Sequence, residues 1–180
     1  MTTLAKARFA QIVLPRLDEG YRLARWLTGS ASDAEDVVQE ACIRAYRAIE
    51  NFAEGNARAW FLTIVRNAAY SWLQRHRPSK LVSLEDMPIE AQHEVETGGI
   101  LVAAVPTPED LLLAKQRSVA LKNAVEKLPL HLRETLVLRE FHGLSYREIA
   151  AISNVPTGTV MSRLAKARQS LLSLLKETDH

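Results

Sequence analysis

Apolar residues recur every three or four positions along most of this chain, which is the spacing of one buried face of an α-helix. Residues 4–27 follow this spacing, and Pro15 predicts a kink or break within them, while Gly29 predicts their end. Residues 57–76 form a second amphipathic run with the same period. Leu, Ala, Arg and Glu are frequent and aromatic residues are few, which favours helices over strands. The pattern predicts an all-α fold.

A helix between these two runs is predicted to begin at Ser32, because Ser32 and Glu35 have the spacing of a capping box. Its apolar positions from Ala34 to Ile49 would face inward. The opposite face is polar and carries three residues that we single out, namely Asp36, Gln39 and Glu40. Such a face is either solvated surface or a docking site.

The helical period fades over residues 79–106, where Pro and Gly residues interrupt the chain. No Lys or Arg occurs from Leu81 to Ala114, although acidic residues are frequent there. A segment of this length is too long for an ordinary loop inside a compact domain. We therefore predict a flexible acidic linker over 79–106, between two small helical domains at 1–78 and 107–180.

The second domain is predicted to begin with Thr107 as the N-cap and Pro108 as the first helical residue. This helix would run to about Lys127. Another helix would follow from Pro129 through Phe141, with Phe141 facing inward.

The remaining sequence predicts a helix-turn-helix. Ser145 and Glu148 form a second capping box, which starts a short helix at 146–153, and a tight turn then leads to Pro156 and a longer helix. One side of the longer helix is apolar, and the other side carries polar groups that can contact phosphates and base edges: Thr157, Thr159, Ser162, Arg163, Lys166 and Arg168. The alternative is an amphipathic helical hairpin with a solvated cationic face.

The composition indicates a soluble protein and gives no sign of a membrane protein. The 180 residues are 47% hydrophobic and 24% charged, as in soluble globular proteins, and the net charge of +2 is too small to indicate nucleic-acid binding by itself. A single cysteine allows no internal disulfide and suits the cytoplasm. We find no signal peptide and no apolar run of membrane-spanning length, so no membrane insertion is expected.

The histidines give no support to an enzyme. The five histidines are His76, His93, His131, His142 and His180. None of them has metal-ligand spacing such as HExxH. We therefore expect no metal, no cofactor and no catalytic residue.

Several motifs resemble a known family. Residues 128–139, 143–150 and 155–164 resemble the fourth-region domain of sigma factors of the extracytoplasmic-function (ECF) type, in the sigma-70 superfamily, through LP…RETLVLR, GLSYREIA and VPTGTVMSRL. Residues 33–41 and 59–67 resemble the second-region domain of the same family, through DAEDVVQEA and AWFLTIVRN. The two resemblances lie in the family's order and cover nearly the whole chain outside the linker.

The resemblance implies a protein that combines with core RNA polymerase and recognises promoter DNA. Asp36, Gln39 and Glu40 would dock on the clamp helices of the largest polymerase subunit. The second domain would also contact the flap of the other large subunit, and its helix from Pro156 would recognise the −35 element. The resemblance, together with a basic stripe at the end of the 57–76 helix, assigns these residues to the −10 element: Phe52, Asn56, Arg66, Asn67, Arg75 and Arg77. From the residues alone, Phe52 could equally be a buried staple and Asn67 an ordinary surface residue.

The family also implies an anti-sigma factor as inhibitory partner and a stress or envelope-signal regulon. Met161 and Ala165 stand where many relatives have basic residues, so the family's contacts at these two positions do not transfer. The rival hypothesis is a dimeric helix-turn-helix regulator whose first half is a sensor or a dimerisation module. Such a regulator would bind palindromic sites without polymerase.

Overall fold

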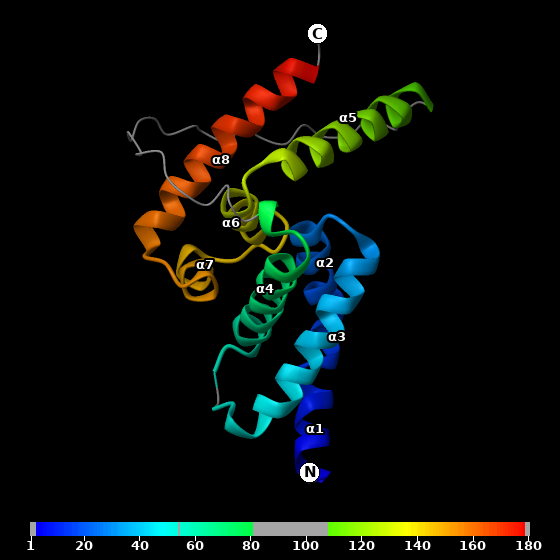
Figure 1. The fold of residues 1–180 in the computed structure, drawn as a ribbon. Helices are drawn as coiled ribbons and strands as arrows, with labels where there is room; N and C mark the ends of the chain where they lie inside the picture. The colour runs from blue at the N-terminus through cyan, green and yellow to red at the C-terminus, as the bar shows by residue number, and fades with distance from the viewer. Residues whose placement is uncertain (1–2, 54, 81–107, 179–180) are drawn as a thin grey trace.

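The computed structural model describes residues 3–53, 55–80 and 108–178. Every regular element within these ranges is a helix, which confirms the all-α prediction (Figure 1). The predicted linker lies almost entirely outside the described residues, as does Thr107, the predicted cap. The domain boundaries at 78 and 107 therefore stay predictions.

The N-terminal lobe comprises the described residues up to 80. Its elements in chain order are α1 (Thr3–Ile12), η1 (Leu14–Arg16), α2 (Leu17–Thr28), α3 (Ala31–Ala48), η2 (Ile49–Asn51), α4 (Ala57–His76) and η3 (Pro78–Lys80). Helices α2, α3 and α4 pack against one another around fully buried side chains such as Leu23, Leu27 and Phe61. A Cβ atom on Gly20 would lie 2.8 Å from Cε1 of Phe61, so α2 and α4 approach too closely for a larger residue.

The ends of these helices follow the predicted chemistry with one correction. Pro15 lies in the 3-10 turn that separates α1 from α2, and Gly29 ends α2 in the left-handed conformation with φ of 76°. The predicted capping box at Ser32 is wrong, because α3 begins one residue after Ser30. Ser30 is extended and its side chain accepts a hydrogen bond from the Asp33 N–H (3.3 Å), so Ser32 already lies inside the helix.

The C-terminal lobe comprises residues 108–178 and folds as α5 (Pro108–Lys127), α6 (Leu130–Glu140), α7 (Tyr146–Ser153) and α8 (Thr157–Thr178). The predicted capping box is confirmed, since the side chains of Ser145 and Glu148 each accept from the other's backbone N–H. Asn154 makes the tight turn in the left-handed conformation (φ 54°). Helices α7 and α8 therefore form the predicted helix-turn-helix, which packs on α6.

Phe141 is a second correction, because its side chain is 49% exposed rather than buried. The ring lies at the C-cap of α6 and packs against Trp26 of the N-terminal lobe, with ring centroids 4.9 Å apart. Its apolar surface is thus shared between solvent and the other lobe.

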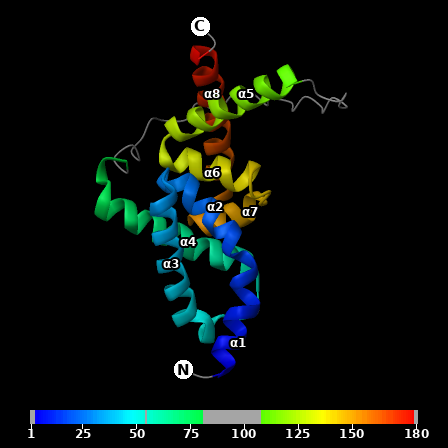
Figure 2. The same cartoon turned by 90° about the vertical axis from the view of Figure 1, so that its right-hand side faces the viewer.

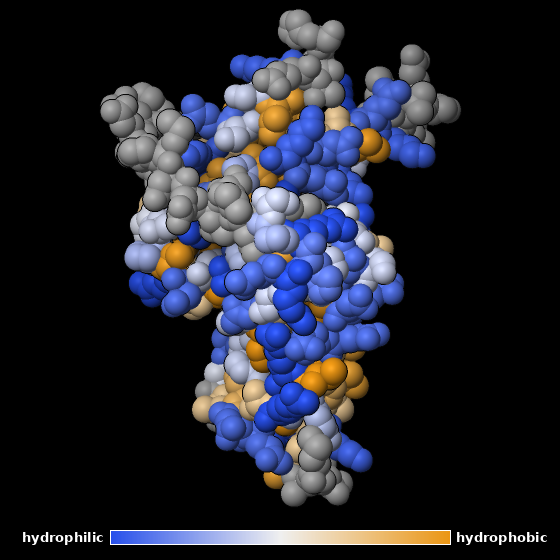
Figure 3. Space-filling view, viewed as in Figure 1, coloured by the Kyte–Doolittle hydropathy of each residue, from blue (hydrophilic) through white to orange (hydrophobic). Residues whose placement is uncertain are grey.

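The two lobes pack against each other along α2 and α4 on one side and α6 and α7 on the other, as both views show (Figures 1 and 2). Their buried apolar residues form one continuous cluster. The N-terminus lies at one end of the molecule, beyond α1, and the C-terminus at the other, beyond α8 (Figure 1). Apolar surface is seen at both of these ends, while hydrophilic side chains dominate between them (Figure 3).

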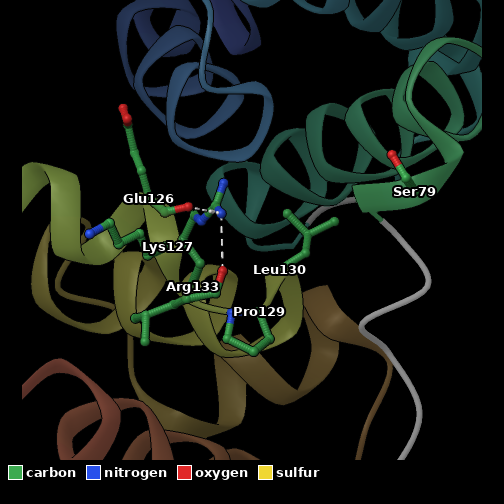
Figure 4. A pocket seen from close by; sticks show the side chains of 7 residues that line it. Ser79, Glu126, Lys127, Pro129, Leu130 and Arg133 are labelled. Atoms are coloured by element: carbon green, nitrogen blue, oxygen red, sulfur yellow. Dashed lines mark hydrogen bonds between the residues drawn. The ribbon is translucent and has the colours of Figure 1, made fainter. Parts of the chain in front are cut away.

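Arg133 helps to join the lobes. Its guanidinium donates to the backbone carbonyls of Glu126 and Leu128 at the end of α5, and to that of Trp26 in α2 (3.3 Å). Free carbonyls at helix ends carry partial negative charge, which favours a cation there. Arg133 also lines a pocket of about 250 Å³ between Ser79 and the turn from α5 to α6 (Figure 4). The guanidinium is already hydrogen-bonded to these carbonyls. We therefore interpret the pocket as a gap where the two lobes meet.

Candidate nucleic-acid interface

Helix α8 presents the predicted −35 residues. Its inner side is fixed by Val160, Leu164 and Ala167, which are buried against α6 and α7. Thr157 is exposed, and the remaining candidates are half-buried: Thr159, Ser162, Arg163, Lys166 and Arg168. Met161, which replaces a basic residue of the family, is 55% exposed on the outer side. The first turns of α8 thus form an anchored helix with an accessible outer face.

Two of the cationic candidates already have neighbours within the protein. Arg168 donates to Glu140 (2.8 Å), and both side chains remain more than 40% exposed. The positive charge of Arg163 opposes the raised pKa of the Tyr70 hydroxyl on α4, as the smallest of the influences on that group. Exposed ion pairs are weak, so the Glu140 pair leaves Arg168 able to exchange partners.

The predicted polymerase-docking face is the outer side of α3. Asp36 and Gln39 are exposed, while Glu40 is half-buried and accepts from Arg44 one turn later (2.9 Å). The inward stripe of the same helix is buried against α2 and α4, as predicted. The polar face is therefore free to meet another protein.

Phe52, the first −10 candidate, is half-buried and packs against Trp60, with ring centroids 4.5 Å apart. Its backbone carbonyl accepts from Arg8 (2.7 Å). One face of the ring is thus covered by Trp60, which holds the side chain in place at the start of α4.

The amide and basic candidates of α4 meet the C-terminal lobe. Asn56 caps α4 by accepting from the Ala59 N–H (3.0 Å), and its amide donates to Glu148 of α7 (2.8 Å). Arg66 donates from Nε to Glu134 of α6 (2.7 Å) and from Nη1 to the exposed Asn67 (3.2 Å). The structure therefore brings Asn56 against α7 and Arg66 against α6, with the exposed Asn67 beside Arg66.

The basic end of α4 is not a continuous stripe. Arg75 is exposed and donates to the Ser71 carbonyl of its own helix (3.1 Å), whereas Arg77 pairs with Asp33 of α3 (3.0 Å). Of the six −10 candidates, Asn56 and Arg66 contact the C-terminal lobe and Asn67 lies beside Arg66, whereas Phe52 packs within the N-terminal lobe and two lie at the far end of α4.

Glu134 is the residue that the sequence reading missed. Its side chain is 0% exposed, and it accepts from Arg66, from the Tyr70 hydroxyl (2.5 Å) and from the Ser153 hydroxyl (2.9 Å). A buried carboxylate requires such partners. One signal was available, because Arg133 and Glu134 lie between the apolar positions Leu132 and Leu136 of α6, and charged residues on a buried helix need partners elsewhere.

The electrostatics of this cluster fit its burial. Burial and the adjacent Glu134 both raise the pKa of the Tyr70 hydroxyl, so it remains a donor. Burial favours a lower pKa for Arg66, but Glu134 more than offsets it, so the pKa of Arg66 is raised and its charge is kept. The cluster is a charge-assisted hydrogen-bond network between the lobes.

A second polar contact between the lobes involves His142, whose side chain is 3% exposed. Its Nδ1 lies 3.3 Å from Glu19 of α2, and Arg58 of α4 donates to both Glu19 and the His142 carbonyl. Burial lowers the pKa of His142 despite the opposing pull of Glu19. The buried Nε2 has no hydrogen-bond partner.

The described ranges carry little other chemistry. No group of three or more His, Cys, Asp or Glu residues there could hold a metal ion. None of the helices in the described part of the chain is both long and apolar enough to span a membrane. Cys42 is half-buried, and burial raises the pKa of its thiol.

Comparison with known proteins identifies both lobes. Residues 13–78 match the family Sigma-70 region 2, and residues 118–171 match Sigma-70, region 4. The ECF RNA polymerase sigma-E factor of Escherichia coli K12 is 41% identical over 144 residues, which are 78% of this chain and 73% of that protein. The RNA polymerase sigma-H factor of Pseudomonas aeruginosa is 37% identical over 145 residues, which are 78% of this chain and 72% of that protein.

Solved structures agree. The sigma factor RpoE of Bartonella quintana, in complex with the anti-sigma factor NepR, superposes with a TM-score of 0.66 at 29% identity, covering 93% of this chain and 96% of that one. CnrH, in complex with the cytosolic domain of CnrY, has the same fold, with a TM-score of 0.62 at 23% identity over 94% and 88% of the two chains. The chain belongs to the ECF group of the sigma-70 family of RNA polymerase sigma factors.

Proposed function

We propose that this sigma factor docks on core RNA polymerase through the α3 face of Asp36, Gln39 and Glu40, and directs it to promoters. The outer face of α8, with Arg163 and Lys166, binds the −35 element. The turn before α4, with Phe52 and Asn56, and the α4 face near Arg66 and Asn67 bind the −10 element.

The observation that carries this proposal is the pairing of two family regions, each with an accessible polar surface on a helix whose opposite side is buried. A recognition helix needs this arrangement to enter a major groove. The protein itself performs no catalysis and works in the cytoplasm beside the polymerase.

We also propose an anti-sigma factor as a partner. The support is the likeness to the Bartonella RpoE, whose structure contains the anti-sigma factor NepR. An inhibitor of this kind would keep the chain from polymerase until a signal releases it.

Run-off transcription with purified core polymerase over a genomic promoter library tests the proposal. The full chain should confer initiation at a defined subset of promoters, and core polymerase alone should not. A dimeric regulator would instead bind palindromic duplex sites without polymerase. Duplex binding of that kind, together with no change in start-site selection, would contradict the proposal.

A further inference from the structure

The centre of the outer face of α8 carries no charge. Gly158, Met161 and Ala165 are exposed, and their spacing of three and four residues places them in one line along the helix. We call these three residues the uncharged stripe. Met161 is 55% exposed, so the stripe presents an apolar side chain to any molecule that α8 meets. Half-buried cations border the stripe, because the helical period places Lys166 on one side of it and Arg168 on the other.

The described fold gives no reason for a glycine at position 158. Gly158 is not one of the glycines with positive φ, which are Gly29 and Gly143. A Cβ atom built on it would meet no other described part of the chain within 4 Å. Glycine destabilises a helix relative to alanine, so folding alone would favour a larger residue here. Glycine at such a position suits a partner that approaches the backbone closely.

The hydroxyl beside the stripe is already hydrogen-bonded within the helix, because Ser162 donates from Oγ to the Thr159 carbonyl (3.0 Å). The side chains of Met161 and Ala165 have no donor. A guanine that faced them would lose water from O6 and N7 without gaining a hydrogen bond, which is costly. A thymine instead presents its C5 methyl group in the major groove, where apolar side chains contact it favourably. The stripe therefore has the chemistry to recognise thymine.

We propose that the uncharged stripe gives this sigma factor a preference for thymine at two base pairs of the −35 element, with Met161 and Ala165 each covering one C5 methyl group. Gly158 lets the first turn of α8 approach the base edges, and Lys166 and Arg168 contact phosphates on either side. This inference rests on the proposed −35 role of α8, and it deepens that role by naming the base that the helix recognises.

The spacing of the two side chains sets the spacing of the two thymines. Positions 161 and 165 are about one helical turn apart, which is about 6 Å along the axis. Base pairs follow one another every 3.4 Å or so, and the thymines should therefore lie within about two base-pair steps of each other, on either strand. Loss of one covered methyl group should weaken binding about fourfold, which corresponds to about 0.8 kcal/mol.

The test uses holoenzyme assembled from the full chain and core polymerase, on a promoter found by run-off transcription. Each thymine of its −35 element is replaced in turn by deoxyuridine, which lacks only the C5 methyl group and keeps every hydrogen-bonding group. We compare the affinities of the wild type, Met161→Ala and Met161→Arg. Leu172→Ala is the matched control, because Leu172 is a similarly exposed apolar residue (53%) about 17 Å farther along α8.

Deoxyuridine at each of two positions should weaken wild-type binding about fourfold, and the Leu172→Ala holoenzyme should respond in the same way. Met161→Ala should lose the response at one of these positions. Met161→Arg should prefer guanine to thymine at that same position, since arginine donates to O6 and N7 of guanine. Because Met161 is exposed, all of these variants should keep the unfolding temperature of the wild type.

A wild type that binds every deoxyuridine promoter as tightly as the thymine promoter would overturn the inference. A −35 element without thymine at the base pairs required for binding would also overturn it, as would a Met161→Ala holoenzyme with the full wild-type response. Failure of the wild-type holoenzyme to initiate at any promoter would instead overturn the proposed function.

Discussion

Acidification should destabilise the contact between the lobes through His142. The ring is 97% buried, its pKa is lowered by burial, and its Nε2 has no acceptor nearby. In the unfolded chain the same ring titrates near 6.5. As the pH falls through 6.5 the unfolded chain therefore binds a proton that the folded chain does not, and stability decreases.

The magnitude follows from that proton. One proton changes the free energy of unfolding by at most about 1.4 kcal/mol per pH unit, so about 1 kcal/mol should be lost between pH 7.5 and 5.5. The groups that face His142 act in both directions: Glu19 favours its protonation, and Arg58 and Arg22 oppose it. His131, whose pKa is also lowered, acts in the same direction but less, because it is more exposed. Glu19 itself titrates below this window.

Urea unfolding of the full chain at pH 7.5, 6.5 and 5.5 provides the assay. The variant His142→Asn keeps a donor for Glu19 but does not titrate, so its stability should vary less with pH than that of the wild type. His76→Asn, at an exposed position at the end of α4, serves as the control and should keep the wild-type slope. A wild type whose stability rises on acidification, or a His142→Asn slope equal to that of the wild type, would refute the reasoning.

Two further predictions concern the proposed contact surfaces. Arg163→Ala should weaken binding of the holoenzyme to promoter DNA by roughly 1 to 3 kcal/mol if the side chain makes a bidentate base contact. Filter binding measures this affinity. If the variant binds the same promoter as tightly as the wild type, Arg163 is not among the −35 contacts. Asp36→Arg should weaken association with core polymerase without lowering the unfolding temperature, since Asp36 is exposed on α3; full affinity in a polymerase pull-down would remove this face from the docking surface.

Local patterns predicted the helices well because periodicity and capping are properties of adjacent residues. The expected bounds of α4 and α7 coincide with the observed ones, and the Ser145 capping box forms as predicted. The cap predicted at Ser32 was wrong because Ser30 and Ser32 are both suitable N-cap residues. Since α2 ends at the left-handed Gly29, Ser30 is the serine that caps α3.

The contact between the lobes could not be predicted in this way. Glu134 meets partners 68 and 64 residues earlier in the chain, Arg66 and Tyr70, and no local pattern encodes such a pairing. Phe141 was expected inside its own lobe for the same reason, whereas its ring packs on Trp26. The sequence thus predicted the candidate DNA-binding residues but not the contacts that Glu134 and Glu148 of the other lobe make with two of them.

The account places the −10 surface and the −35 surface on different lobes, which pack against each other in the free chain, so a distance between the lobes tests it most directly. Spin labels at Ile43→Cys in α3 and Lys122→Cys in α5, both exposed positions, with Cys42→Ser to remove the native thiol, report the separation in the full chain. We predict one short distance in the free protein and a much longer one after core polymerase and promoter DNA are added. An unchanged distance in a holoenzyme that initiates transcription would contradict the account.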